Sequence, residues 1–138
     1  MNMKTKLKPV LIVFFIFSLA CNKAEEEFNN EVLKGIWIHT ETKTDTMDFN
    51  IGLFASENAF ELKRGKEVRN GYTLSKIGSD IYRYKLKGDS IYLNGMLSSY
   101  AGYFQYYFKM SDDNKSFKIG SFAPFTGGLM VNEFRRIE

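Results

Sequence analysis

The stretch Ile81-Tyr-Arg-Tyr-Lys-Leu-Lys-Gly-Asp-Ser-Ile-Tyr-Leu-Asn94 decides the fold class. Alternate side chains of a strand fall on opposite faces of its sheet. In the first half of the stretch, the apolar face carries Tyr82, Tyr84 and Leu86, and the basic face carries Arg83 and Lys85. Lys87-Gly-Asp89 is a tight turn into a second apolar run, so the stretch predicts a β-hairpin.

The same pattern of strands and turns continues on both sides of this hairpin. Runs rich in β-branched and aromatic residues are typical of strands, and Gly, Asn, Asp and Ser between them are typical of turns. The longest run, 103–110, places Phe104, Tyr106, Phe108 and Met110 on one face. The other predicted strands are 35–41, 46–54, 58–63, 71–75, 116–120 and 129–137.

These runs predict an all-β fold. An open sheet of about eight strands would expose edges that template aggregation, and closure removes them. We therefore expect a small antiparallel up-and-down β-barrel of about eight strands, with a β-sandwich as the alternative. Eight strands leave an interior that side chains fill or that holds one small ligand.

Residues 1–20 have the pattern of a signal peptide. Three basic residues, Lys4, Lys6 and Lys8, precede the apolar run from Val10 to Ala20. This run of about eleven residues is shorter than the roughly twenty that a membrane-spanning helix needs. Ser18-Leu-Ala-Cys21 resembles the lipobox of bacterial lipoproteins, which implies that Cys21 is lipidated and begins the mature chain. The alternative is an ordinary signal peptide with an incidental cysteine.

Residues 21–32 are polar and mostly acidic, so we expect a flexible tether with at most one short helical turn. Lys23 followed by Glu25-Glu-Glu27 resembles the surface-export signal of some Bacteroidota lipoproteins, but a solvated spacer accounts for it equally well. From these segments we expect the protein to lie in the cell envelope, held at the outer membrane by a lipid anchor. Either membrane face remains open, and one domain is expected over residues 33–138.

The charge of the mature chain excludes a nucleic-acid-binding role. Removal of Lys4, Lys6 and Lys8 takes 3 of the 19 basic residues, so 16 remain against 16 acidic ones. A nucleic-acid interface needs clustered Lys and Arg on a basic domain. We expect no nucleic-acid partner.

Leu33-Lys-Gly-Ile-Trp37 resembles the Gly-x-Trp motif that opens the first strand of lipocalins and of lipocalin-like, Bacteroidota-type bacterial lipoproteins. The resemblance covers residues 33–138. It implies that Trp37 closes one end of the barrel, with an arginine of the last strand packed across its ring. Arg136 matches that position, and Arg135 is the alternative. A cation–π contact of this kind contributes about 0.5–2 kcal/mol.

The polar residues predict no enzyme, metal site or cofactor. His39 is the only histidine, so it lacks partners for a metal site or a catalytic triad and is best explained as an ordinary strand residue. Asp112-Asp-Asn114 lacks the ligand spacing of a calcium loop and is explained as a hairpin turn. The remaining candidate carboxylates are explained as solvated strand and turn positions: Asp48, Glu57, Glu61 and Glu67.

Two predicted connections, 95–102 and 122–130, carry unusually apolar side chains. They act either as lids over a barrel end or as a ligand portal or partner surface. Asp45-Thr46 and Asp89-Ser90 match a short O-glycosylation pattern of Bacteroidota, which leaves modification of Thr46 and Ser90 as a hypothesis.

These features predict a membrane-anchored, non-enzymatic lipoprotein that binds a small apolar ligand. The candidate ligand-binding residues are the apolar face of the longest strand: Phe104, Tyr106, Phe108 and Met110. The alternative is a structural or protein-interaction lipoprotein with a filled barrel and no ligand. A protein partner is not identified by the sequence.

Overall fold

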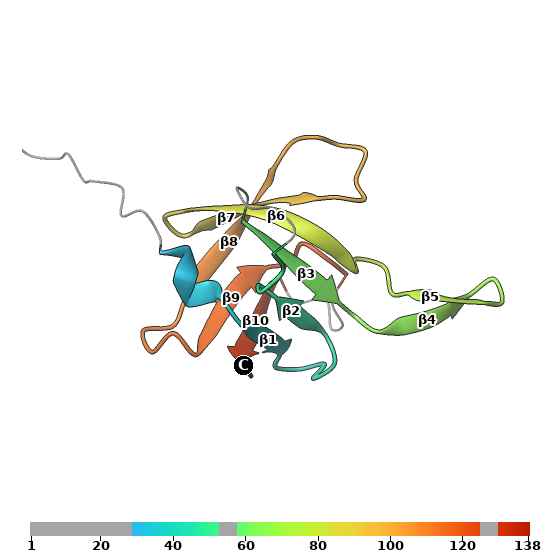
Figure 1. The fold of residues 1–138 in the computed structure, drawn as a ribbon, viewed down its shortest axis with the longest axis horizontal. Coiled ribbons are helices and arrows are strands. Elements are labelled where there is room, and N and C mark those ends of the chain that lie inside the picture. The colour runs from blue at the N-terminus through green and yellow to red at the C-terminus, as the bar shows by residue number, and fades with distance from the viewer. Residues whose placement is uncertain (1–28, 53–57, 125–129) are drawn as a thin grey trace, which may run out of the picture.

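The computed structural model describes residues 29–52, 58–124 and 130–138 and shows an all-β fold (Figure 1). Eight antiparallel strands close into a barrel in the order β1-β10-β9-β8-β7-β6-β3-β2. The predicted barrel is confirmed, and closure excludes the β-sandwich. The barrel strands are β1 (Ile36–His39), β2 (Thr46–Asp48), β3 (Ala59–Lys63), β6 (Asp80–Lys87), β7 (Ser90–Gly95), β8 (Phe104–Met110), β9 (Ser116–Gly120) and β10 (Val131–Arg136).

Two further strands form a separate hairpin outside the barrel. β4 (Lys66–Arg69) pairs only with β5 (Tyr72–Ser75) around a two-residue turn. The turn residues Asn70 and Gly71 both have positive φ, 53° and 81°, which is the geometry that a two-residue hairpin turn requires. The interpretation of 71–75 as a barrel strand was therefore wrong, because a local pattern does not identify the strand's partner.

The two ends of the barrel differ in what covers them. At the helix end, the short 3₁₀ helix η2 (Asn30–Leu33) leads into β1 and buries Leu33 completely. The strand registers place the connections 40–45, 64–79 and 96–103 at the opposite end, the loop end. Figure 1 shows η2 and the β4–β5 hairpin on opposite sides of the barrel. No helix within the described residues is long and apolar enough to cross a membrane.

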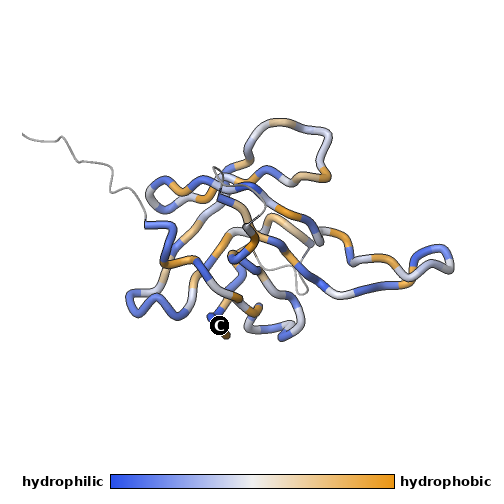
Figure 2. The backbone as a smooth tube through the Cα atoms, viewed as in Figure 1, coloured by the Kyte–Doolittle hydropathy of each residue, from blue (hydrophilic) through white to orange (hydrophobic). Residues whose placement is uncertain are grey.

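The alternation predicted for the strands produces the core. On β6, Tyr84 is buried, Tyr82 and Leu86 pack against the core, and Lys85 is exposed. Figure 2 shows apolar segments in the barrel strands and also on the hairpin and the β7–β8 connection. The side chains with no more than 2% exposure in the apolar core are Leu33, Trp37, Met47, Phe60, Leu62, Ile91, Phe108, Phe117, Ile119 and Phe134.

Some strands are shorter than predicted. β2 ends at Asp48, where the side-chain carboxylate accepts a hydrogen bond from the Asn50 backbone N–H at 2.9 Å. The pattern had extended this strand to residue 54, whose position falls outside the described residues. β10 begins at Val131 rather than at residue 129, which also lies outside them. The signal segment, Cys21 and Glu57 are likewise outside the described residues.

Candidate functional site

Trp37 and Arg136 meet at the helix end of the barrel. They are directly opposite each other in the β1–β10 pairing, and the Arg136 guanidinium lies 4.6 Å from the centre of the Trp37 ring. Trp37 is fully buried and donates from Nε1 to the Leu33 carbonyl at 2.8 Å, while Arg136 donates to the Val32 carbonyl. Arg135, the alternative, is opposite Ile38 instead.

Gly35 explains why a glycine precedes this tryptophan. Its φ is +124°, and a Cβ atom built on it would lie 2.1 Å from the Glu138 carbonyl oxygen. That carbonyl also accepts the Ile36 backbone N–H at 3.0 Å. Any larger residue would separate the chain end from β1 and disturb the register that brings Arg136 over Trp37.

Aromatic rings of the described residues pack against one another inside the barrel. The Phe117 ring centre lies 4.9 Å from that of Trp37, and 5.4 Å from those of Phe108 and Phe134. Phe49 adds edge contacts to Phe117 and Tyr84. Contacts of this geometry stabilise a core beyond the area they bury.

The four candidate ligand-binding residues do not form one enclosed face. Phe108 is buried in this aromatic core, and Tyr106 and Met110 pack against it with partial exposure. Phe104 is 53% exposed at the loop end, where its ring lies 4.9 Å from Tyr100. The expectation of an inward face that includes Phe104 is therefore wrong, since β8 extends past the covered part of the barrel there.

Phe122 and Ala123 cover the loop end. The Phe122 ring centre lies 5.1 Å from Tyr82 and 6.0 Å from Tyr106, and Ala123 is buried against Gly78. Burial, and then the nearby charge of Asp80, raises the pKa of Tyr82 to about 12. Burial also raises the pKa of Tyr106. The lid interpretation is confirmed for the described start of the 122–130 connection.

The 95–102 connection is not a lid. Leu97 is 82% exposed, and Met96 and Tyr100 are exposed as well. Asn94 donates to the carbonyls of Tyr100 and Gly102 at 3.0 and 2.6 Å, which fixes the shape of this connection while its apolar side chains face solvent. The lid interpretation is wrong here, and the partner-surface alternative remains.

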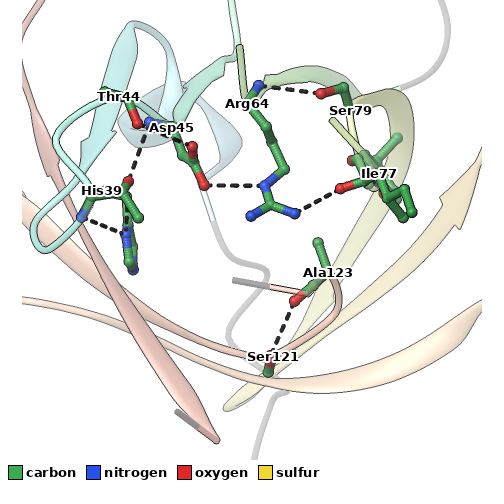
Figure 3. Close-up of polar contacts among 11 residues, drawn as sticks. His39, Thr44, Asp45, Arg64, Ile77, Ser79, Ser121 and Ala123 are labelled. Carbon is green, nitrogen blue, oxygen red and sulfur yellow. Dashed lines mark hydrogen bonds and ion pairs between the residues drawn. The ribbon is translucent and has the colours of Figure 1, made fainter. Parts of the chain in front are cut away.

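A buried ion pair fixes the base of the hairpin, as Figure 3 shows. Arg64 Nε lies 3.0 Å from Asp45 Oδ2, with 6% and 2% of the two side chains exposed. Arg64 also donates from Nη1 to the Ile77 carbonyl at 2.6 Å, and its backbone N–H donates to Ser79 Oγ at 3.2 Å. Arg64 therefore links the 40–45 connection to both ends of the 64–79 segment.

The other polar candidates have structural explanations. His39 is fully buried, its Nδ1 accepts the Thr42 backbone N–H at 3.2 Å, and its ring packs against Phe134. Glu61 pairs with Lys63 and Glu67 with Arg69, at 3.1 and 3.0 Å. Within the described ranges, His, Cys, Asp and Glu form no group of three or more that could hold a metal ion.

The structure also describes the predicted 112–114 turn and the two candidate glycosylation sites, Thr46 and Ser90. Asp113 accepts from Ser111 Oγ and the Lys115 backbone N–H, which lowers the pKa of its carboxyl and closes the predicted β8–β9 turn. Thr46 and Ser90 are half-buried, and Ser90 accepts from Gln105 Nε2 at 2.9 Å. Neither hydroxyl therefore lies on a fully exposed turn, since Thr46 is in β2 and Ser90 is in β7.

One hollow that described residues line lies outside the barrel. We call it the outer groove: about 540 Å³, between the base of the β4–β5 hairpin and the exposed 96–97 segment. The sequence did not predict this groove, because residues from four separate segments of the chain meet there. The only feature of the sequence that pointed to it was the apolar 95–102 connection. Among the side chains that line it are Lys63, Lys66, Ser75, Ile81, Met96 and Leu97.

Comparison of the chain with protein-family models, curated proteins and solved structures finds no match.

Proposed function

We propose that this chain is a lipid-anchored, non-enzymatic lipoprotein whose barrel presents the outer groove to a protein partner. The observation that carries the proposal is the distribution of apolar side chains. Those inside the barrel are packed against one another, whereas Leu97 and Met96, which line the groove, are 82 and 40% exposed, and Tyr72 on the hairpin is 72% exposed. Exposed apolar patches of this kind mark interaction surfaces.

The position of the groove supports a partner other than the anchoring membrane. The described chain begins at Asn29 and enters the barrel at the helix end, whereas the groove lies at the loop end. Residues 22–28 span at most about 25 Å when fully extended. An acylated Cys21 would thus hold the helix end near the lipid and leave the loop end facing away from it.

The chemistry of the groove favours a partner with apolar and acidic side chains. Ile81, Met96 and Leu97 offer apolar contact and Lys66 offers positive charge, whereas Lys63 is already paired with Glu61. Electrostatic complementarity of this kind selects partners and speeds their encounter more than it adds affinity.

Site-directed photocrosslinking in the host envelope tests the proposed surface. A benzoylphenylalanine at Leu97 should give a discrete crosslinked product, and the same residue at Lys115, in the β8–β9 turn at the helix end, should not. The yield of this crosslinked product should fall when Lys66 is changed to Glu. Equal products from both positions, or none from Leu97, would overturn the proposed surface.

The anchor is tested separately. Cys21→Ser should move the chain from the membrane fraction to the soluble fraction, because the acylated thiol would be lost. Membrane retention of this variant would contradict the anchor and leave the groove proposal unaffected.

A small apolar ligand remains the second candidate. Tyr82, Tyr106 and Phe122 are only partly buried at the loop end, and Phe104 is exposed at the same end. Native mass spectrometry of the protein from its own host should reveal a retained molecule if the barrel carries one. Loss of that mass in Phe122→Ala, with the fold intact, would place the molecule under this lid.

A further inference from the structure

Beside the outer groove, strand β5 has a free edge whose backbone groups could pair with another strand. β4 and β5 pair only with each other among the described strands, so each has one unpaired edge. β4 carries three charged residues, Lys66, Glu67 and Arg69, and charges protect an edge from pairing. β5 has the sequence Tyr-Thr-Leu-Ser and is exposed along its whole length.

The turn identifies which backbone groups of β5 point outward. A two-residue turn makes Arg69 and Tyr72 a hydrogen-bonded pair, and such pairs alternate along an antiparallel ladder. The Lys76 N–H donates to the Gly65 carbonyl at 3.0 Å, which continues the same alternation. The N–H and C=O of Thr73 and of Ser75 therefore face away from β4.

The free edge faces the same space as the groove. β3 leads into β4, and β5 leads into β6, whose other neighbour is β7. Beyond the barrel rim, the edge of β5 is thus on the side where β7 ends and the 96–103 connection begins. In Figure 1, β5 lies on the side of the hairpin toward that connection. Ser75, Met96 and Leu97 all line the outer groove.

Charge indicates which kind of strand fits. Lys66, Arg69 and Lys76 outnumber Glu67 on the hairpin. Arg69 Nη2 also donates to the Ser75 carbonyl at 2.9 Å, which holds a guanidinium at the free edge. The second lone pair of that carbonyl still accepts a partner N–H. A second copy would bring the same excess of basic charge to this edge, whereas an acidic strand would complement it.

We propose that an extended, acidic and apolar segment of the partner protein adds to β5 as a third strand, with its end in the outer groove. This inference rests on the proposed function and names the partner segment and its binding mode. Main-chain hydrogen bonds to Thr73 and Ser75 hold the segment, and alternate side chains select it. The added strand also stabilises the hairpin, since two strands alone are marginal in water.

A matched pair of proline substitutions tests the edge. Thr73 and Val68 are directly opposite in the hairpin, and the N–H of each points outward, on opposite edges. Thr73→Pro removes an N–H from the proposed edge, whereas Val68→Pro removes one from the protected edge. Thr73→Val keeps the N–H and changes only the side chain.

The probe is a fluorescein-labelled eight-residue peptide of alternating valine and glutamate, titrated against the full chain by fluorescence anisotropy. It should bind at least ten times more tightly than the matching valine–lysine peptide. Thr73→Pro should weaken binding at least tenfold, and Val68→Pro and Thr73→Val less than threefold. Failure of the acidic peptide to bind, or equal effects of the two prolines, would overturn the inference.

Two further outcomes separate the alternatives. Sedimentation velocity of the full chain should show a monomer; a dimer that Thr73→Pro dissociates would make a second copy the occupant and refute the partner-strand inference. Retention of the Leu97 crosslink in Thr73→Pro would also refute strand addition, while leaving the proposed groove intact. Loss of that crosslink in the proline variant, but not in Val68→Pro, supports both.

Discussion

The carboxylate of Asp45 and the guanidinium of Arg64 form a buried ion pair 19 residues apart in the chain, with Nε and Oδ2 3.0 Å apart. This pair joins the connection after β1 to the base of the β4–β5 hairpin, to which the partner strand is proposed to add. The position of the hairpin, and therefore of the groove, depends on it.

Asp45→Asn should lower the free energy of unfolding by about 3–5 kcal/mol, because a buried charge without its partner is strongly destabilising. Chemical denaturation measures the loss. Glu61→Gln is the control, since the Glu61–Lys63 pair is exposed and such pairs contribute at most about 1 kcal/mol. Similar losses in both variants would contradict the structural role of the buried pair.

Arg136→Met should destabilise the barrel more than Arg135→Met. Arg136 loses its contact with Trp37, worth about 0.5–2 kcal/mol, and its hydrogen bond to the Val32 carbonyl. Arg135 is exposed and makes neither contact. Trp37 is the only tryptophan, so its fluorescence reports both the unfolding curve and the change around the ring. An unchanged emission maximum in Arg136→Met would refute the contact.

Asn132→Leu should stabilise the protein. Asn132 is fully buried on β10, and neither polar atom of its amide has a hydrogen-bond partner among the described residues. Burying an unsatisfied polar group costs about 1–3 kcal/mol, so an apolar side chain of similar size should recover part of that cost. A higher thermal midpoint is expected. A lower one would indicate that a bound water or ligand satisfies this amide.

Stability should fall as the pH rises from about 10 to about 12. Burial raises the pKa values of Tyr82 and Tyr84 to about 12 in the folded state, whereas an unfolded tyrosine titrates near 10. Between these values the unfolded chain binds fewer protons, so stability is complete below pH 10 and is lost above it. Urea midpoints measured across this range should decline.

The doubly substituted chain Tyr82→Phe, Tyr84→Phe is the control for this pH dependence. It should lose less stability between about pH 10 and about pH 12 than the parent does, because neither ring can ionise. It also lacks the hydrogen bond from Tyr82 to the Gly78 carbonyl, so its stability at neutral pH provides the reference. An undiminished decline would assign the effect to other groups.

The sequence predicted what depends on neighbouring residues. The alternation of Tyr82, Lys85 and Leu86 predicted which side chains pack against the core, and the turn residues predicted the β6–β7 and β8–β9 hairpins. Gly35 and Trp37 predicted the Arg136 contact only through a resemblance, because no local rule connects residues a hundred positions apart.

What the sequence by itself determined is the all-β class and the strand faces, since both follow from the two-residue period of a strand. Only the tertiary structure decided which strands share a sheet. It placed 71–75 in a separate hairpin, left Phe104 exposed and joined Arg64 to Asp45. These outcomes depend on closure of the barrel, which fixes strand partners by packing across the whole interior, and no short stretch of sequence contains that information.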